Sequence, residues 1–105
     1  MAGDDLTLTD NTDQNRYEAH LGGELAGYLE YQLTDDLMVI SHTEVLAAHE
    51  GHGVGSALAR HVLDDVDRNS DRSVIVLCPF VLSWLERHPD YQRLVYGRRP
   101  RNDQS

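Results

Sequence analysis

Lysine is absent from this 105-residue sequence, so all nine positive charges are arginines, and the net charge is −9. Nucleic acids are densely negative, and the proteins that bind them present a basic surface. An acidic chain of this composition is unsuited to that class on electrostatic grounds. We therefore expect no nucleic-acid partner.

Cysteine and long apolar runs are also scarce. The one cysteine, Cys78, cannot form an internal disulfide, which is consistent with a reducing compartment. No apolar run approaches the roughly 20 residues that a membrane-spanning helix needs. Met1 is followed by acidic and polar residues, unlike a secretory leader. We expect a cytoplasmic monomer or dimer without a membrane partner.

The residues that are present are typical of a globular domain, 40% hydrophobic and 26% charged. The length suffices for one hydrophobic core but leaves no room for a separate substrate domain. We predict one ordered domain over residues 15–96. Residues 1–14 are expected to be flexible except around Leu6 and Leu8, and residues 97–105 are expected to form a flexible tail.

Alternating apolar residues predict strands at residues 16–21 and 24–33, which the pair Gly22–Gly23 would join in a tight hairpin. Residues 37–45 predict a third strand. The run 73–77, which is apolar from Val74 onward, predicts a short strand inside the sheet.

Two segments have helical spacing instead. Apolar residues recur every three or four positions over about 54–68, which predicts one amphipathic helix. The segment 78–88 predicts a second, with Cys78 as its N-cap and Pro79 as its first residue, and residues 90–96 predict a short turn or strand. The resulting order favours an α/β fold, a mixed and mostly antiparallel sheet with helices packed on it.

The glycine-rich stretch at 50–56, EGHGVGS, connects the third strand to the first helix. The first turn of a helix has unpaired N–H groups and the positive end of the dipole, so a diphosphate would fit there. The alternative is a plain glycine-rich helix start that binds nothing. No lysine follows as in a Walker loop, and the spacing is not that of a dinucleotide fold.

Three motifs together resemble the GNAT acetyltransferases, in particular a small single-domain branch. They are ISHTEV at 40–45, the glycine turn, and the segment 74–95, which contains CPFV and HPDY. The likeness covers about residues 16–96. One position departs from it, because Glu50 stands where the family usually has Arg or Gln, and a carboxylate cannot donate a hydrogen bond to phosphate.

This resemblance implies an acetyl-CoA site. The backbone of the third strand would hold the pantetheine arm at Thr43, Glu44 and Val45, and the glycine turn would hold the diphosphate of coenzyme A. The residues implied for the turn are Gly51, His52, Gly53, Val54, Gly55 and Ser56.

Two side chains are candidates for catalysis. Cys78 lies where a buried strand meets a helix N-terminus, which stabilises a thiolate, so it could accept the acetyl group or lie beside the reacting carbon. The alternative is a small buried hydrophobic residue. His42 could remove a proton from an incoming ammonium group, or it could be a hydrogen-bonded core histidine.

No metal site is expected. His49 and His52 are three residues apart, but they flank a flexible turn, and no partner stands at a convincing ligand spacing. Tyr91 is expected to pack the last helix, or alternatively to protonate a departing thiolate.

The sequence therefore predicts an acetyl-CoA-dependent transferase acting on an amine, directly or through Cys78. A module that binds coenzyme A with little or no catalysis is the first alternative. A purely structural interaction domain is the second.

Overall fold

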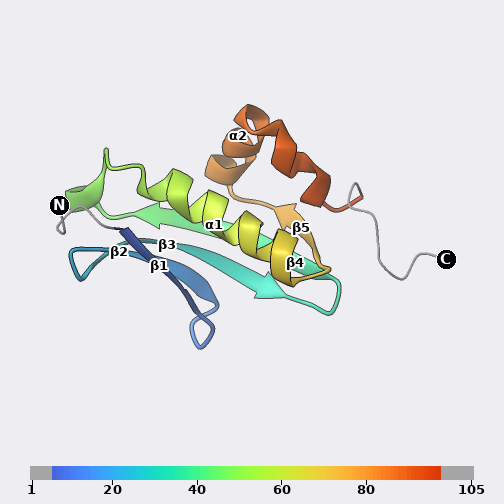
Figure 1. Ribbon diagram of the computed structural model, residues 1–105, viewed down its shortest axis with the longest axis horizontal. Coiled ribbons are helices and arrows are strands. Elements are labelled where there is room, and N and C mark those ends of the chain that lie inside the picture. Colours follow the sequence, from blue (N-terminus) through green and yellow to red (C-terminus); the bar gives the residue numbers. More distant parts are fainter. Residues whose placement is uncertain (1–5, 98–105) are drawn as a thin grey trace.

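The computed structural model describes residues 6–97. Its five strands follow one another across the sheet in chain order: β1 (Leu6–Asn11), β2 (Arg16–Leu21), β3 (Glu24–Leu33), β4 (Leu37–Val45) and β5 (Ser73–Val76). Neighbours are antiparallel except β4 and β5, which are parallel because the helix α1 (Val54–Asn69) connects them (Figure 1). The predicted α/β fold with a mixed, mostly antiparallel sheet is confirmed.

The first strand was not predicted from the sequence. Residues 1–14 were expected to be flexible except around Leu6 and Leu8, whereas residues 6–11 form β1, in which Leu6 and Leu8 pack against the core. Leu8 lies opposite Ala19 of β2, so pairing with a buried neighbour stabilises a strand that is too short and too polar to be evident alone. Residues 1–5 and the predicted tail from residue 98 onward lie outside the described residues.

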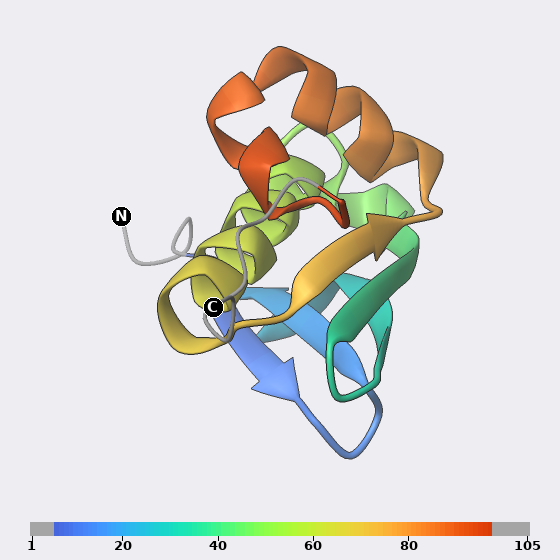
Figure 2. The ribbon, with the colours of Figure 1, turned by 90° about the vertical axis from the view of Figure 1, so that its right-hand side faces the viewer.

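The helices lie on the same side of the sheet (Figures 1 and 2). The segment before α1 contains a short 3₁₀ helix, η2 (Ala47–His49), and α2 (Pro79–Arg87) runs into a second, η3 (Pro89–Leu94). Cys78 is the N-cap of α2 and Pro79 its first residue, as predicted. The expected turn or strand after Pro89 is η3, followed by a single bridge from Val95 to Val74. None of the described helices is long and apolar enough to cross a membrane.

The core lies between the sheet and these helices. α1 turns an apolar stripe toward the strands, and Trp84 of α2 is fully buried beside it. The largest fully buried side chains are Trp84, Tyr17, Tyr31, Leu29, Ile40, Leu58, Leu63, Leu94, Val54, Val62, Val66 and Val74.

Two irregularities in β4 determine the geometry at one end of the sheet. Ile40 pairs with Tyr31 but His42 pairs with Glu30, so Ser41 is an extra residue that forms a β-bulge. Pairing between β4 and β5 covers only residues 37–40 and 73–76, and Leu77 N–H then donates to Ile40 C=O at 2.9 Å. Beyond that point β4 continues to Val45 alongside β3, and its other edge is not paired with β5.

Candidate functional site

The parting of β4 and β5 brings Cys78 and Thr43 together. Cys78 follows β5, is 3% exposed, and donates a hydrogen bond from Sγ to Thr43 Oγ1 at 3.4 Å. Thr43 lies opposite Leu29, a core residue of β3, so both face the helical side of the sheet. A free thiol thus lies next to the unpaired edge of β4, beside residues that the sequence predicted for pantetheine binding.

His42 lies on the other face of the sheet. It pairs with Glu30 across the strands, and its ring lies 6.4 Å from that of Tyr28. Its Nε2 is 3.1 Å from Oε1 of Glu44, and both side chains are about half exposed. Because Thr43 and Cys78 face the helices, the two predicted catalytic residues are on opposite sides of the sheet. His42 is therefore a solvent-facing residue rather than a core histidine.

The glycine turn before α1 is exposed, whereas the first two residues of the helix, Val54 and Gly55, are buried. Gly51 and Gly53 have φ of 88° and 73°, and a Cβ at either position would meet nothing within 4 Å. Gly53 is the N-cap, no side chain in the described structure caps the helix, and the N–H of Ala57 donates to Gly53 C=O. The earlier N–H groups of the first turn remain for an external acceptor. Residues 51–53 are exposed, so an anion can reach the turn that precedes the helix.

Gly55 has a mechanical role. It is buried, and a Cβ added there would lie 2.7 Å from Cζ of Phe80, so the first turns of α1 and α2 pack together at this point. Ser56, the next residue, accepts a hydrogen bond from the indole of Trp84. Gly55 therefore permits close helix packing, whereas Gly51 and Gly53 supply the positive φ of the turn.

Gly27 of β3 is not among the site residues predicted from the sequence. A Cβ there would lie 2.6 Å from the carbonyl oxygen of Glu44 and 2.9 Å from Cγ1 of Val54. Because glycine has no Cβ, the end of β4 and the start of α1 can both approach β3 closely at this position. An isolated glycine inside a strand pattern is the signal that could have revealed it.

The remaining candidates have structural partners. His49 Nε2 lies 3.4 Å from Glu24 Oε1, and residues 6–97 contain no group of three His, Cys, Asp or Glu side chains arranged to hold a metal. Tyr91 packs against Trp84 and donates to Asp64 at 2.8 Å, a hydrogen bond that raises the pKa of the tyrosine. Tyr91 therefore links η3 to α1.

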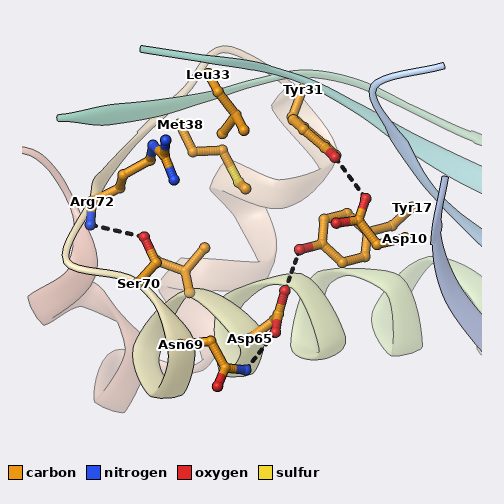
Figure 3. Close-up of a pocket in the computed structure, with 10 residues that line it drawn as sticks. Asp10, Tyr17, Tyr31, Leu33, Met38, Asp65, Asn69, Ser70 and Arg72 are labelled. Carbon is orange, nitrogen blue, oxygen red and sulfur yellow. Dashed lines mark hydrogen bonds between the residues drawn. The ribbon is translucent and has the colours of Figure 1, made fainter. Parts of the chain in front are cut away.

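A cavity of about 140 Å³ lies at the opposite, C-terminal end of α1 (Figure 3). Tyr17 donates to Asp65, and Tyr31 donates to Asp10 at 2.6 Å. Burial, followed by these hydrogen bonds, raises the pKa of both tyrosines, so they remain protonated donors. None of the site residues predicted from the sequence lines this cavity. The Tyr17–Asp65 pair joins β2 to α1, and the Tyr31–Asp10 pair joins β3 to β1.

Comparison with known proteins agrees with this architecture. The family described as GCN5-related N-acetyl-transferase matches residues 16–94. No curated protein matches the chain.

Two solved structures share the fold. The solution structure of a GCN5-like protein of Staphylococcus aureus, proposed to be an N-acetyltransferase, superposes with a TM-score of 0.65 at 21% identity, covering 100% of both chains. A ribosomal-protein-alanine N-acetyltransferase from Brucella melitensis biovar Abortus 2308 superposes with a TM-score of 0.52 at 18% identity, covering 86% of this chain and 66% of the other. At these identities the likeness concerns the fold, while the family match covers most of the sequence. The chain belongs to the GCN5-related N-acetyltransferase family.

Proposed function

We propose that this protein is an acetyl-CoA-dependent N-acetyltransferase that transfers an acetyl group to an amine. The observation that carries the proposal is a juxtaposition at one end of the sheet. Within residues 6–97, the part of β4 that does not pair with β5, a helix start without a side-chain cap and the buried thiol of Cys78 adjoin one another there. Family membership supports the choice of ligand and reaction.

The residues present fit coenzyme A. The open space at Gly51 and Gly53 and the uncapped first turn of α1 suit a diphosphate. The backbone of β4 from Thr43 to Val45 offers N–H and C=O groups to an extended amide chain, as a neighbouring strand would. These donors act at short range, whereas the surface charge of the chain, net −9, is screened within about 10 Å at ordinary salt.

Glu50 departs from the family pattern and is exposed. A carboxylate close to a diphosphate weakens binding, and salt reduces that repulsion because the side chain is in water. Backbone amides of residues 51–56 therefore carry the affinity in this proposal.

Cys78 has two roles compatible with its place. In the covalent route a new bond forms between Sγ and the acetyl carbon, the bond to the coenzyme sulfur breaks, and the thiol proton leaves with the coenzyme thiol. The acetylated Cys78 then gives its acetyl group to the amine and recovers a proton. In the direct route the amine attacks the thioester of acetyl-CoA itself, and Cys78 lines the site. Acetyl-CoA supplies the activated acetyl group in both routes.

In this proposal His42 and Glu44 act on the amine and not on the thioester. They are exposed on the opposite face, so they do not contact the thiol. An imidazole beside a carboxylate can accept a proton from an ammonium group that arrives from that face. In this proposal the amine and the thioester approach from opposite sides where β4 and β5 part.

The function is tested by titrating the protein with acetyl-CoA in a calorimeter and by measuring thiol release against a panel of amines. Saturable binding with release in the presence of an amine supports the transferase. Binding without release on any amine favours the coenzyme-binding module. If the protein does not bind acetyl-CoA, the remaining candidate is a purely structural interaction domain.

A further inference from the structure

Trp84 connects the candidate diphosphate site to the interior. It is the one tryptophan of the sequence and is fully buried. Its indole Nε1 donates to Ser56 Oγ at 2.8 Å, which joins α2 to the first turn of α1. The contact between Gly55 and Phe80 lies beside this bond, so the two helix starts are held together at adjacent residues.

The environment of Trp84 fixes its ring. His88 stacks on it with ring centroids 3.8 Å apart and planes inclined by 13°, and His88 Nδ1 lies 2.8 Å from Trp84 C=O. Tyr91 packs at a tilted angle with its centroid 5.1 Å away. The indole N–H is therefore held toward Ser56 by contacts with α2 and η3.

The hydrogen-bonding capacity of the two groups gives this contact a direction. An indole N–H can only donate, whereas a serine hydroxyl both donates and accepts. Ser56 is the acceptor toward Trp84, which leaves its own proton for another oxygen. Ser56 is the third residue of α1, in the turn where free N–H groups converge on an anion.

We propose that Trp84 is a positioning residue for the diphosphate of coenzyme A. By donating to Ser56, it orients the serine hydroxyl as an additional donor toward the ligand, without itself touching the ligand. The inference rests on the proposed function, because it assumes that the start of α1 binds coenzyme A.

The test uses Trp84→Phe, which keeps an aromatic ring and loses the N–H, together with Ser56→Ala and the double variant. We expect each single change to weaken coenzyme A binding about fivefold, as for one net hydrogen bond. The double variant should bind coenzyme A no more weakly than the single variant with the lower affinity, because both changes remove the same interaction. Circular dichroism and thermal denaturation establish that each variant is folded.

A second ligand separates positioning from general damage. Acetylpantetheine has the thioester and the amide arm but no diphosphate, so its binding, followed by NMR titration, should be unchanged in all three variants. Equal losses for both ligands would overturn the proposal and leave the bond a packing feature. Unchanged coenzyme A affinity in folded variants would overturn it as well.

Fluorescence of Trp84 provides a readout that does not depend on Trp84→Phe folding. Coenzyme A should change the emission in the natural protein, and saturating coenzyme A should leave the emission of Ser56→Ala largely unchanged. An equal change in both proteins would contradict a link through Ser56. If the natural protein binds no coenzyme A, the proposed function fails first, which distinguishes the two failures.

Discussion

The thiol of Cys78 donates a hydrogen bond to the hydroxyl of Thr43 where β4 and β5 part. The two residues are 35 positions apart in the sequence, and the crossover through α1 brings them together. The contact places the only sulfhydryl of the chain at the strand edge proposed to hold an acyl thioester.

Replacement of Cys78 distinguishes the two routes of transfer. If the thiol carries the acetyl group, acetyl-CoA should add one hydroxylamine-sensitive acetyl mass to the protein, and Cys78→Ala should lack it and lose at least about tenfold in turnover. Intact-protein mass spectrometry and thiol release measure the two effects. Full turnover by a folded Cys78→Ala protein would assign Cys78 to packing.

Replacement of His42 tests whether this residue removes the proton from the amine without affecting the binding of acetyl-CoA. Because His42 and Cys78 face opposite sides of the sheet, His42→Gln should leave coenzyme A affinity and any acetylation of Cys78 unchanged. Transfer to an amine should fall by about 10²-fold or more at neutral pH, the usual contribution of a general base. Calorimetry and initial rates on one amine provide the comparison. An unchanged rate would exclude His42 as the base.

Gly53→Val tests the glycine turn and has a matched control. Gly53 and Gly23 both have positive φ, 73° and 86°, and a Cβ at either position meets nothing within 4 Å. Each change to valine should therefore lower the free energy of unfolding by a similar amount, on the order of 1–2 kcal/mol. Gly53→Val should abolish coenzyme A binding, whereas Gly23→Val, in the β2–β3 hairpin, should retain it.

Equal retention of affinity in both valine variants would locate the diphosphate elsewhere. Equal loss in both would indicate that reduced stability, rather than the shape of the turn, weakens binding. Calorimetry at a temperature where both variants are folded distinguishes these outcomes.

The tyrosines at the far end of α1 predict a loss of stability in alkaline solution. Burial and hydrogen bonds to Asp65 and Asp10 raise the pKa of Tyr17 and Tyr31 above the ordinary value of 10.0. Below pH 10 both the folded and unfolded chains hold these protons, so the contribution to stability is complete. Above it the unfolded chain releases them first, and the free energy of unfolding should fall as pH rises.

Tyr17→Phe is the variant that checks this assignment. It should lower the free energy of unfolding at neutral pH by about 2 kcal/mol, as for a buried hydrogen bond to a charged group. It should also flatten the decline above pH 10. Urea denaturation over a pH series measures both, and an unchanged alkaline slope would mean that other groups cause the decline.

Local patterns predicted most of the fold. The alternation in 16–33 and the helical spacing in 54–68 correspond to β2, β3 and α1, because each segment buries one continuous apolar face. Residues 6–11 alternate too weakly to indicate a strand alone, and β1 is stabilised by its partner β2. The parallel pairing of β4 and β5 followed from the strand–helix–strand order.

The side-chain directions in β4 could not be derived from alternation. Met38 and Ile40 face the core, and a regular strand would place His42 beside them and Thr43 outside. The bulge at Ser41 reverses this order, so Thr43 faces Cys78 and His42 faces solvent. The bulge depends on how β4 pairs with Glu30 and Tyr31 of β3. The sequence of β4 alone does not indicate that pairing.

An NMR titration of the ¹⁵N-labelled protein with coenzyme A tests the central claim most directly, because every backbone amide reports separately. We predict the largest shifts at the amides of Gly51 to Ser56, with a second group from Thr43 to Val45. Spectra that stay unchanged at millimolar coenzyme A, or shifts confined to the Tyr17 and Asp65 end of α1, would contradict the assignment.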